Sequence, residues 1–336
     1  MMTCFLCNSL NAATKKVSVN GNSESVNEGL ELASRSFRNT FQRNSLTINY
    51  DISGIKKIFD LGVGINAYRT EYGKFYVRNR NGDLVPLTSD SKMTTESSTN
   101  AYASLEKKQM RLTLNTNQPI NQEYFKFQSY GASFQKYFFK KSTIFSLDYT
   151  KFQMHRPATY YRSPLDLQFY SAPTSINSEI FSLSWEQIIS EKIKTINGLT
   201  YFKANEERPS YQGIFTKWAF GLTPTLFAKF HYAYNKEDTS AALKTDRGYF
   251  DNQLGSLEVS WEFIFDWVIS LSYSLVKEDE EDPRTNAKRR TGVDQYGVSL
   301  DYHFSPSTQI NVRASKLETN TGIKSQQIGI GATWYF

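Results

Sequence analysis

Hydrophobic and polar residues alternate along most of the chain from Ser45 onward. In the last segment, apolar residues occupy every second position, and small or polar residues lie between them; the apolar set is Ile328, Ile330, Ala332, Trp334 and Phe336. Side chains at i and i+2 point to the same face of a β-strand, so this period of two predicts a strand with one apolar face. These runs carry no helical period. We therefore expect an all-β protein.

The same alternation recurs in several earlier segments, which are 46–52, 59–67, 218–222, 226–235, 256–263, 267–275, 295–304 and 310–315. Some neighbouring segments are separated by only a few turn-forming residues, as at Ser305-Pro306-Ser307 and Thr223-Pro224. Short, turn-rich separations between strands predict antiparallel hairpins. The sequence therefore predicts an up-and-down arrangement of antiparallel strands.

A soluble β-sandwich also alternates, but aromatic residues at both strand ends have no special purpose there. In this chain aromatic residues gather near predicted strand ends, and the set is Trp218, Tyr232, Trp261, Phe263, Trp267, Tyr302 and Phe304. Amphipathic rings at both ends of an apolar band are typical of the two lipid interfaces of a transmembrane β-barrel. We expect these side chains to face lipid and the opposite, polar face to line the barrel lumen.

Short turns alternate with long polar loops near 155–176, 236–250 and 278–292. In outer-membrane barrels the short turns face the periplasm and the long loops face outside. With about 21 residues for each strand and its connection, residues 42–336 predict a barrel of about fourteen strands, in a range of about twelve to sixteen. The polar stretch 70–98 conflicts with this sidedness unless it hides a strand, for which Lys74 to Leu87 is the candidate.

The N-terminal segments are assigned separately. Residues 1–13 resemble the rear half of a secretory signal peptide, with apolar residues before Ala12-Ala13. The only cysteines, Cys4 and Cys7, lie there, and a metal or redox half-site would need a second Cys/His pair at ligand spacing. Residues 14–41 are polar, and a periplasmic lead-in, a segment in the lumen and an extra strand all remain open.

Composition does not argue against a membrane barrel. The mean hydropathy of −0.51 is low, but a wall that alternates apolar and polar residues averages to such a value. The chain holds 39 Lys+Arg against 33 Asp+Glu, a net charge of +6. The basic residues are scattered and form no stripe, so we expect no nucleic-acid binding. A basic outer rim would instead meet the phosphates of lipopolysaccharide.

Charged residues also occur on the predicted inner face. The lumen-facing candidates are Lys217, Lys229, His231, Glu258, Glu262, Asp301 and Arg313. The cations could bias a pore toward anions, but carboxylates line it too, so the sequence leaves the direction open.

The chain contains three histidines, His155, His231 and His303, and no spacing that brings a Ser-His-Asp site together. No phosphate loop, dinucleotide motif or metal-ligand cluster is present in the sequence. We expect no cofactor, no metal and no enzymatic activity. An outer-membrane hydrolase ranks last among the possible functions.

The last residues, from Gly331 to Phe336, resemble the C-terminal β-signal of bacterial outer-membrane proteins, with Gly331, Trp334 and Phe336 at the matching positions and a departure at Gly329. This resemblance implies recognition by the β-barrel assembly machinery through strand addition. Together with the alternation, the resemblance indicates an outer-membrane barrel. Because a barrel of about fourteen strands is wider inside than its small Ser and Gly side chains can fill, we expect a porin-like channel for small solutes. The alternative is a non-conducting barrel whose loops bind a partner.

Overall fold

The computed structural model describes most of the chain; the described ranges are residues 14–31, 36–55, 58–72, 76–78, 84–86, 92–121, 126–156, 159–162, 168–171, 174–204, 210–237, 249–281, 288–305, 307–320 and 322–335. The predicted signal segment 1–13 and Phe336 lie outside these ranges.

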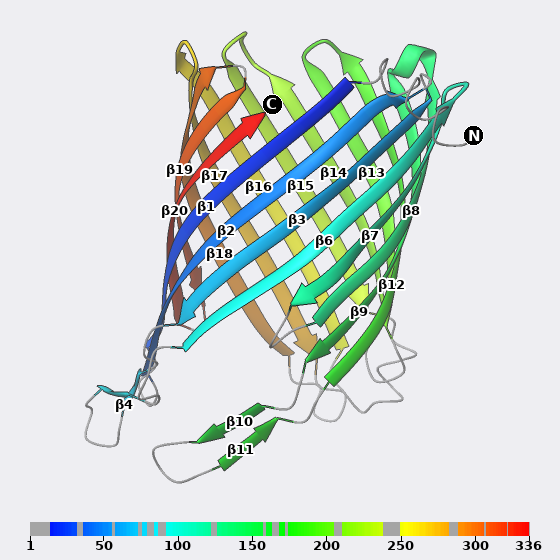
Figure 1. Ribbon diagram of the computed structural model, residues 1–336. Helices are drawn as coiled ribbons and strands as arrows, with labels where there is room; N and C mark the ends of the chain where they lie inside the picture. The colour runs from blue at the N-terminus through cyan, green and yellow to red at the C-terminus, as the bar shows by residue number, and fades with distance from the viewer. Residues whose placement is uncertain are drawn as a thin grey trace.

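Sixteen antiparallel strands form one closed barrel (Figure 1). In chain order the wall strands are β1 (Thr14–Glu31), β2 (Ser36–Ile55), β3 (Phe59–Tyr72), β6 (Lys92–Lys107), β7 (Met110–Asn121), β8 (Lys126–Phe138), β9 (Thr143–Arg156), β12 (Thr174–Ser190), β13 (Ile193–Ala204), β14 (Tyr211–Gly221), β15 (Leu226–Glu237), β16 (Tyr249–Ile264), β17 (Trp267–Glu281), β18 (Lys288–Ser305), β19 (Thr308–Thr319) and β20 (Ile323–Tyr335). Each wall strand pairs with its neighbours in sequence, and β1 pairs with β20 to close the ring. The predicted fold class is confirmed.

The expected number of about fourteen strands is two too low, and sixteen is the upper limit of the expected range. One cause is β1: residues 14–31 pair with β2 along their whole length and with β20 from Ser18 to Leu30. The barrel therefore begins at Thr14 and not at residue 42. Of the three alternatives for residues 14–41, the structure has the extra strand, followed by the first part of β2.

The long connections lie at one end of the barrel, where a short turn also joins β19 to β20, and the connections at the other end are short. The stretch 73–91 leads from β3 to β6 and holds the small hairpin of β4 (Tyr76–Arg78) and β5 (Leu84–Pro86). The predicted hidden strand is thus an excursion beside the loop end of β2, to which β4 pairs. The conflict in sidedness disappears because 73–91 connects strands at the same end as the other long loops.

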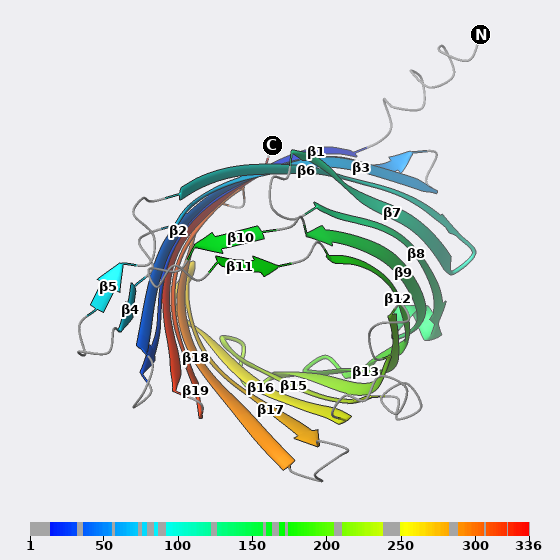
Figure 2. The same cartoon turned by 90° about the horizontal axis from the view of Figure 1, so that it is seen from below.

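The loop end also carries a second hairpin, formed by β10 (Thr159–Arg162) and β11 (Gln168–Ser171). It projects beyond the wall in Figure 1, and it lies within the outline of the ring when the barrel is viewed from that end in Figure 2. The hairpin therefore lies in front of the opening.

Tight turns close the opposite end. The β6–β7 turn uses Lys108 and Gln109, both with positive φ (47° and 65°), as a two-residue type I′ turn requires. A single 3-10 turn, η1 (Phe139–Lys141), joins β8 to β9. Thr14 and Tyr335 also lie at this short-turn end.

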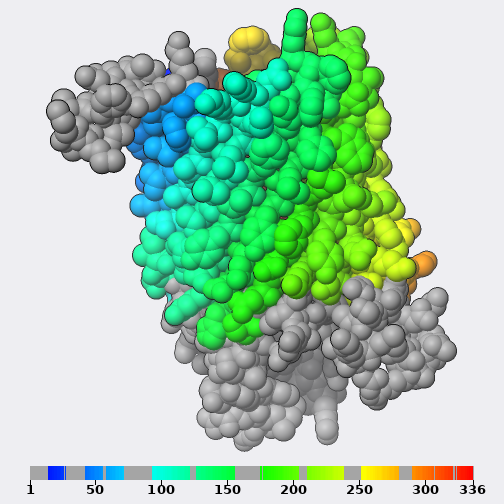
Figure 3. All heavy atoms as spheres, turned by 90° about the vertical axis from the view of Figure 1, so that its right-hand side faces the viewer, coloured from blue at the N-terminus to red at the C-terminus, as the bar shows by residue number. Residues whose placement is uncertain are grey.

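The outer face of the wall is apolar. Large hydrophobic side chains are exposed there on every second residue of the strands, for example Leu271 at 58% and Ile328 at 64%. Figure 3 shows that the side chains of one flank, which includes β6 to β13, form a continuous outer surface. On β17 the apolar outer positions run from Trp267 to Leu275, about 20 Å along the barrel axis at ordinary strand rise and tilt. This height suits the apolar band of a membrane barrel. No helix in the described ranges is long and apolar enough to cross a membrane.

Candidate functional site

The inner face of the wall is polar, because each strand alternates. On β17 the positions between the apolar ones hold Ser270, Ser272 and Ser274. Ser270 lies beside Ser260 of β16 in register, and their hydroxyl oxygens are 2.8 Å apart. Neighbouring strands therefore offer rows of hydroxyl groups toward the lumen.

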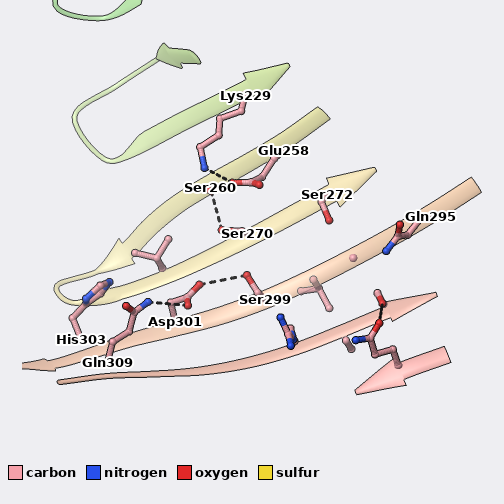
Figure 4. A pocket seen from close by; sticks show the side chains of 17 residues that line it. Lys229, Glu258, Ser260, Ser270, Ser272, Gln295, Ser299, Asp301, His303 and Gln309 are labelled. Atoms are coloured by element: carbon pink, nitrogen blue, oxygen red, sulfur yellow. Dashed lines mark hydrogen bonds and ion pairs between the residues drawn. The ribbon is translucent and has the colours of Figure 1, made fainter. Parts of the chain in front are cut away.

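A hollow on the inner wall is lined by side chains of β15 to β20 (Figure 4). Lys229 donates to Glu258 across β15 and β16 at 2.7 Å. Asp301 of β18 accepts hydrogen bonds from Gln309 (3.1 Å) and Ser299 (3.4 Å). The hollow therefore combines one ion pair with a carboxylate that is held by neutral donors.

A second polar cluster lies on β2, β3, β6 and β7. The Tyr102 hydroxyl donates to Asp51 at 2.8 Å, and the Arg111 guanidinium donates to Asp60 at 3.0 Å. Gly62 lies between Asp51 and Tyr102 in register, and a Cβ atom there would lie 2.1 Å from the Tyr102 ring. Only glycine leaves room for this arrangement.

Ion pairs recur around the inner wall. They are Arg111–Asp60 (3.0 Å), Lys194–Glu186 (2.8 Å), Lys229–Glu258 (2.7 Å) and Arg313–Glu24 (3.9 Å). Near the short-turn end, Lys141 of η1 pairs with Glu106 at 2.9 Å. Lys194–Glu186 and Lys229–Glu258 join adjacent strands, whereas Arg111–Asp60 spans β6 and Arg313–Glu24 spans β20. Much of the inner charge is therefore balanced locally.

Aromatic rings interrupt the polar wall near the loop end. Phe127 and Phe152 lie with ring centroids 5.9 Å apart, Phe152 and Phe202 5.8 Å apart, and Phe202 and Tyr211 5.9 Å apart. Strand alternation puts all four on the inner face of β8, β9, β13 and β14. The lumen therefore has an apolar arc near its loop end.

The structure puts the lumen-facing candidates on the inner face. Lys229, Glu258, Asp301 and Arg313 line the hollow of Figure 4. Register puts the other three candidates on the same face. Lys217 pairs with His231 across β14 and β15, and His231 is two residues from Lys229. Glu262 pairs with Val268, which also lines the hollow.

The girdle candidates point outward, on the same face as the exposed Leu and Ile side chains. The stacked rings of Trp267 and Tyr302 have centroids 4.4 Å apart, and the ring centroids of Trp261 and Phe263 are 5.9 Å apart. Trp218 stacks on Phe220, and its indole N–H donates to Thr216 at 2.8 Å. The remaining two, Tyr232 and Phe304, are 36% and 70% exposed.

The β-signal residues Gly331 and Trp334 belong to β20. Trp334 pairs with Thr308 of β19 and Val19 of β1, so it lies at the closure of the barrel. A Cβ atom at Gly331 would meet the side-chain oxygen of Asn311 at 2.7 Å. The glycine therefore fits an inner position crowded by an asparagine.

The sequence reasoning missed several inner residues, among them Glu24, Tyr102 and Arg111. Asp51 lies in a segment whose alternation was visible, but its partner Tyr102 comes 51 residues later. Glu24 belongs to β1, whose outer positions from Gly21 onward are small or polar. Alternation could have put these side chains on the inner face, but not next to one another.

The three histidines lie apart in register. His155 is near the loop end of β9, His231 pairs with Ser256, and His303 pairs with Gln309. Within the described ranges, no group of three His, Cys, Asp or Glu side chains could hold a metal ion.

Comparisons with known proteins identify the fold. No family model and no curated protein matches the sequence. Among solved structures, OprB of Pseudomonas putida has 5% identity over 100% of this chain and 95% of its own, with a TM-score of 0.55. The outer-membrane protein OpdK of Pseudomonas aeruginosa has 8% identity over 96% and 98%, also at 0.55. OccK2 of the same organism, solved with glucuronate, has 8% identity over 96% and 98%, at 0.54. The chain shares the fold of these barrels.

Proposed function

We propose that this protein is an outer-membrane channel for passive passage of small polar solutes and has no catalytic role. The observation that carries the proposal is a closed barrel of sixteen strands whose inner face is hydroxyl-rich and charged. A barrel of this strand number is too wide for its own side chains to fill, and such barrels enclose an aqueous channel.

The outer face supports the membrane location. An apolar band with aromatic rings near its edge would be unstable in water and is favourable in lipid. Shared fold with an outer-membrane protein such as OpdK agrees with this location. By the usual asymmetry of such barrels, the short-turn end faces the periplasm and the loop end faces outside.

Two partners belong to this proposal. Near the loop end, Lys277, Lys316 and Lys324 occupy outer positions of β17, β19 and β20, where cations meet lipopolysaccharide phosphates. The β20 strand, with Gly331 and Trp334, is the proposed signal for the β-barrel assembly machinery.

Planar-bilayer recording of the detergent-refolded protein tests the channel function. We expect discrete conductance steps in KCl that scale with salt concentration, because a wide polar lumen conducts as water does. Folding is checked by β-sheet circular dichroism and by heat-modifiable gel migration. A folded protein that inserts and stays electrically silent would refute the channel function.

The position of the β10–β11 hairpin favours one alternative function, that of a non-conducting surface barrel whose loops close the lumen. The hairpin lies in front of the opening at the loop end (Figure 2). In that case the folded protein would be silent, and removal of the hairpin would open it.

A further inference from the structure

We infer that the channel prefers cations, an inference that rests on the proposed channel function. The reason is the balance of charge on the described part of the inner wall. Carboxylates outnumber cationic side chains there, although the whole chain carries a net charge of +6.

The paired inner charges contribute no preference. Four carboxylates, Asp60, Glu186, Glu258 and Glu24, each lie within 4 Å of a cationic nitrogen that belongs to the next strand or to the one beyond it. A fifth, Glu106, pairs with Lys141. Because each pair is neutral as a whole, the selectivity depends on the inner charges outside these pairs.

A further group of inner carboxylates lies outside these pairs and consists of Asp51, Asp148, Glu262, Glu278 and Asp301. Several are held by neutral donors: Tyr102 donates to Asp51, Gln309 to Asp301, and Asn252 to Glu278. Asp148 lies between Ser133 and Ser182 in register. Neutral donors hold a carboxylate in place without cancelling its charge, and a carboxylate is normally ionised at neutral pH.

Fewer cations lie outside the pairs among the inner side chains that the structure describes. Lys16 lies 3.9 Å from the centre of the Tyr335 ring, and Lys217 lies 5.6 Å from the centre of the Phe215 ring. Aromatic rings attract a cation but carry no net charge. Three more inner residues, which also interact with neighbouring groups, enter the charge balance. They are two carboxylates, Glu96 and Glu237, and one guanidinium, Arg43. Among the inner residues whose side chains the structure describes, negative charge is therefore in excess.

Carboxylates on the wall of a water-filled passage raise the local concentration of cations and lower that of anions. Glu262 and Asp301 act together at the short-turn end, because both face the lumen and are separated in register by a single residue, Val268. Shared fold does not predict this preference, since OccK2 was solved with glucuronate, an anion.

Reversal potentials across a planar bilayer test the inference. In a tenfold KCl gradient near 0.1 M, we expect potassium to permeate at least about twofold better than chloride. The ratio should fall toward unity in molar salt, because the screening length shrinks from about 10 Å to about 3 Å.

The variant Glu262→Gln with Asp301→Asn should lower the potassium-to-chloride ratio toward unity. Lys217→Gln should raise it. Glu318→Gln is the matched control, because it removes one carboxylate from the outer face, where Glu318 pairs with Lys316 at 2.8 Å. The control should leave the ratio unchanged.

The possible outcomes distinguish failure of the cation preference from failure of the channel function. A conducting protein with a ratio at or below unity overturns the cation preference and leaves the channel function intact. A double variant with an unchanged ratio also overturns the assignment to the wall carboxylates. A folded but silent protein refutes the channel function, and with it the preference.

Discussion

Adjacent residues of one strand meet different solvents in this barrel. Leu271 of β17 faces outward and is 58% exposed, whereas its neighbour Ser272 lines the inner hollow. The outer face of a membrane barrel is solvated by lipid tails, so the exposed Leu271 side chain contacts hydrocarbon and not water. The same substitution should therefore have different costs at these two positions.

Leu271→Arg should reduce the free energy of unfolding by about 2 to 4 kcal/mol, because the charge would lie in the hydrocarbon region. Ser272→Arg should be milder, since the added side chain enters a hydrated lumen. Urea titration of the protein folded in lipid vesicles measures both. Equal losses at the two positions would contradict the assignment of the two faces.

Inner glycines give close-packed polar side chains their space. At Gly62 a Cβ atom would lie 2.1 Å from the Tyr102 ring and 2.5 Å from the Asp51 carboxylate, which are hydrogen-bonded to each other. At Gly255, on the outer face of β16 between Tyr232 and Leu275 in register, a Cβ atom would meet nothing within 4 Å. These two glycines therefore contrast a crowded inner position with an open outer one.

Gly62→Ala should destabilise the protein by about 1 to 3 kcal/mol, the usual cost of overpacking. Gly255→Ala should be nearly neutral. Tyr102→Ala combined with Gly62→Ala should recover part of the loss, because the clashing ring is gone. Unfolding titrations of all three variants test this, and an equal loss at both glycines would refute the packing argument.

Among the elements, the β17–β18 hairpin extends well into the predicted loop 278–292. Its strands run to Glu281 and from Lys288, and register puts Glu280 and Glu281 opposite Arg289 and Lys288. Arg290 donates two hydrogen bonds to Asp279, at 2.6 and 3.0 Å. Opposite charges on facing strands support pairing. The predicted loop 278–292 therefore begins and ends with paired strand residues.

Removal of residues 159–171, with a short Gly-Ser link between residues 158 and 172, should raise the single-channel conductance. The β10–β11 hairpin lies in front of the opening, so its removal widens the path for ions. Planar-bilayer recording compares the variant with the intact protein. The β4–β5 hairpin is the control, because it lies beside β2 outside the ring in Figure 2, and replacing residues 76–86 by an equal Gly-Ser stretch should leave conductance unchanged.

For the molecule as a whole, closure depends on β1. This strand pairs with both β2 and β20, so it satisfies backbone groups on both sides that lipid could not. Its outer positions hold Val17 and Val19, followed by Gly21, Ser23 and Ser25. The weak apolar pattern explains why the sequence left this segment open between strand and lead-in.

Deletion of residues 14–31 should abolish the heat-modifiable, folded form, because β2 and β20 would then be left as open edges. Deletion of residues 2–13 is the control and should leave the refolded protein heat-modifiable. Gel migration with and without boiling reads out both. A folded form that survives the loss of β1 would contradict its role in closure.

The sequence alone determined the fold class, the two faces of most wall strands and the general character of the lumen, because alternation is a local property that every strand records by itself. Only the tertiary structure decided the strand number, the role of residues 14–31, and which inner charges meet. These depend on register between segments that are far apart in the chain, such as Glu24 with Arg313, or Asp51 with Tyr102. The net charge of the chain could not reveal the excess of carboxylates inside, because a sum over residues does not distinguish the lumen from the outer rim.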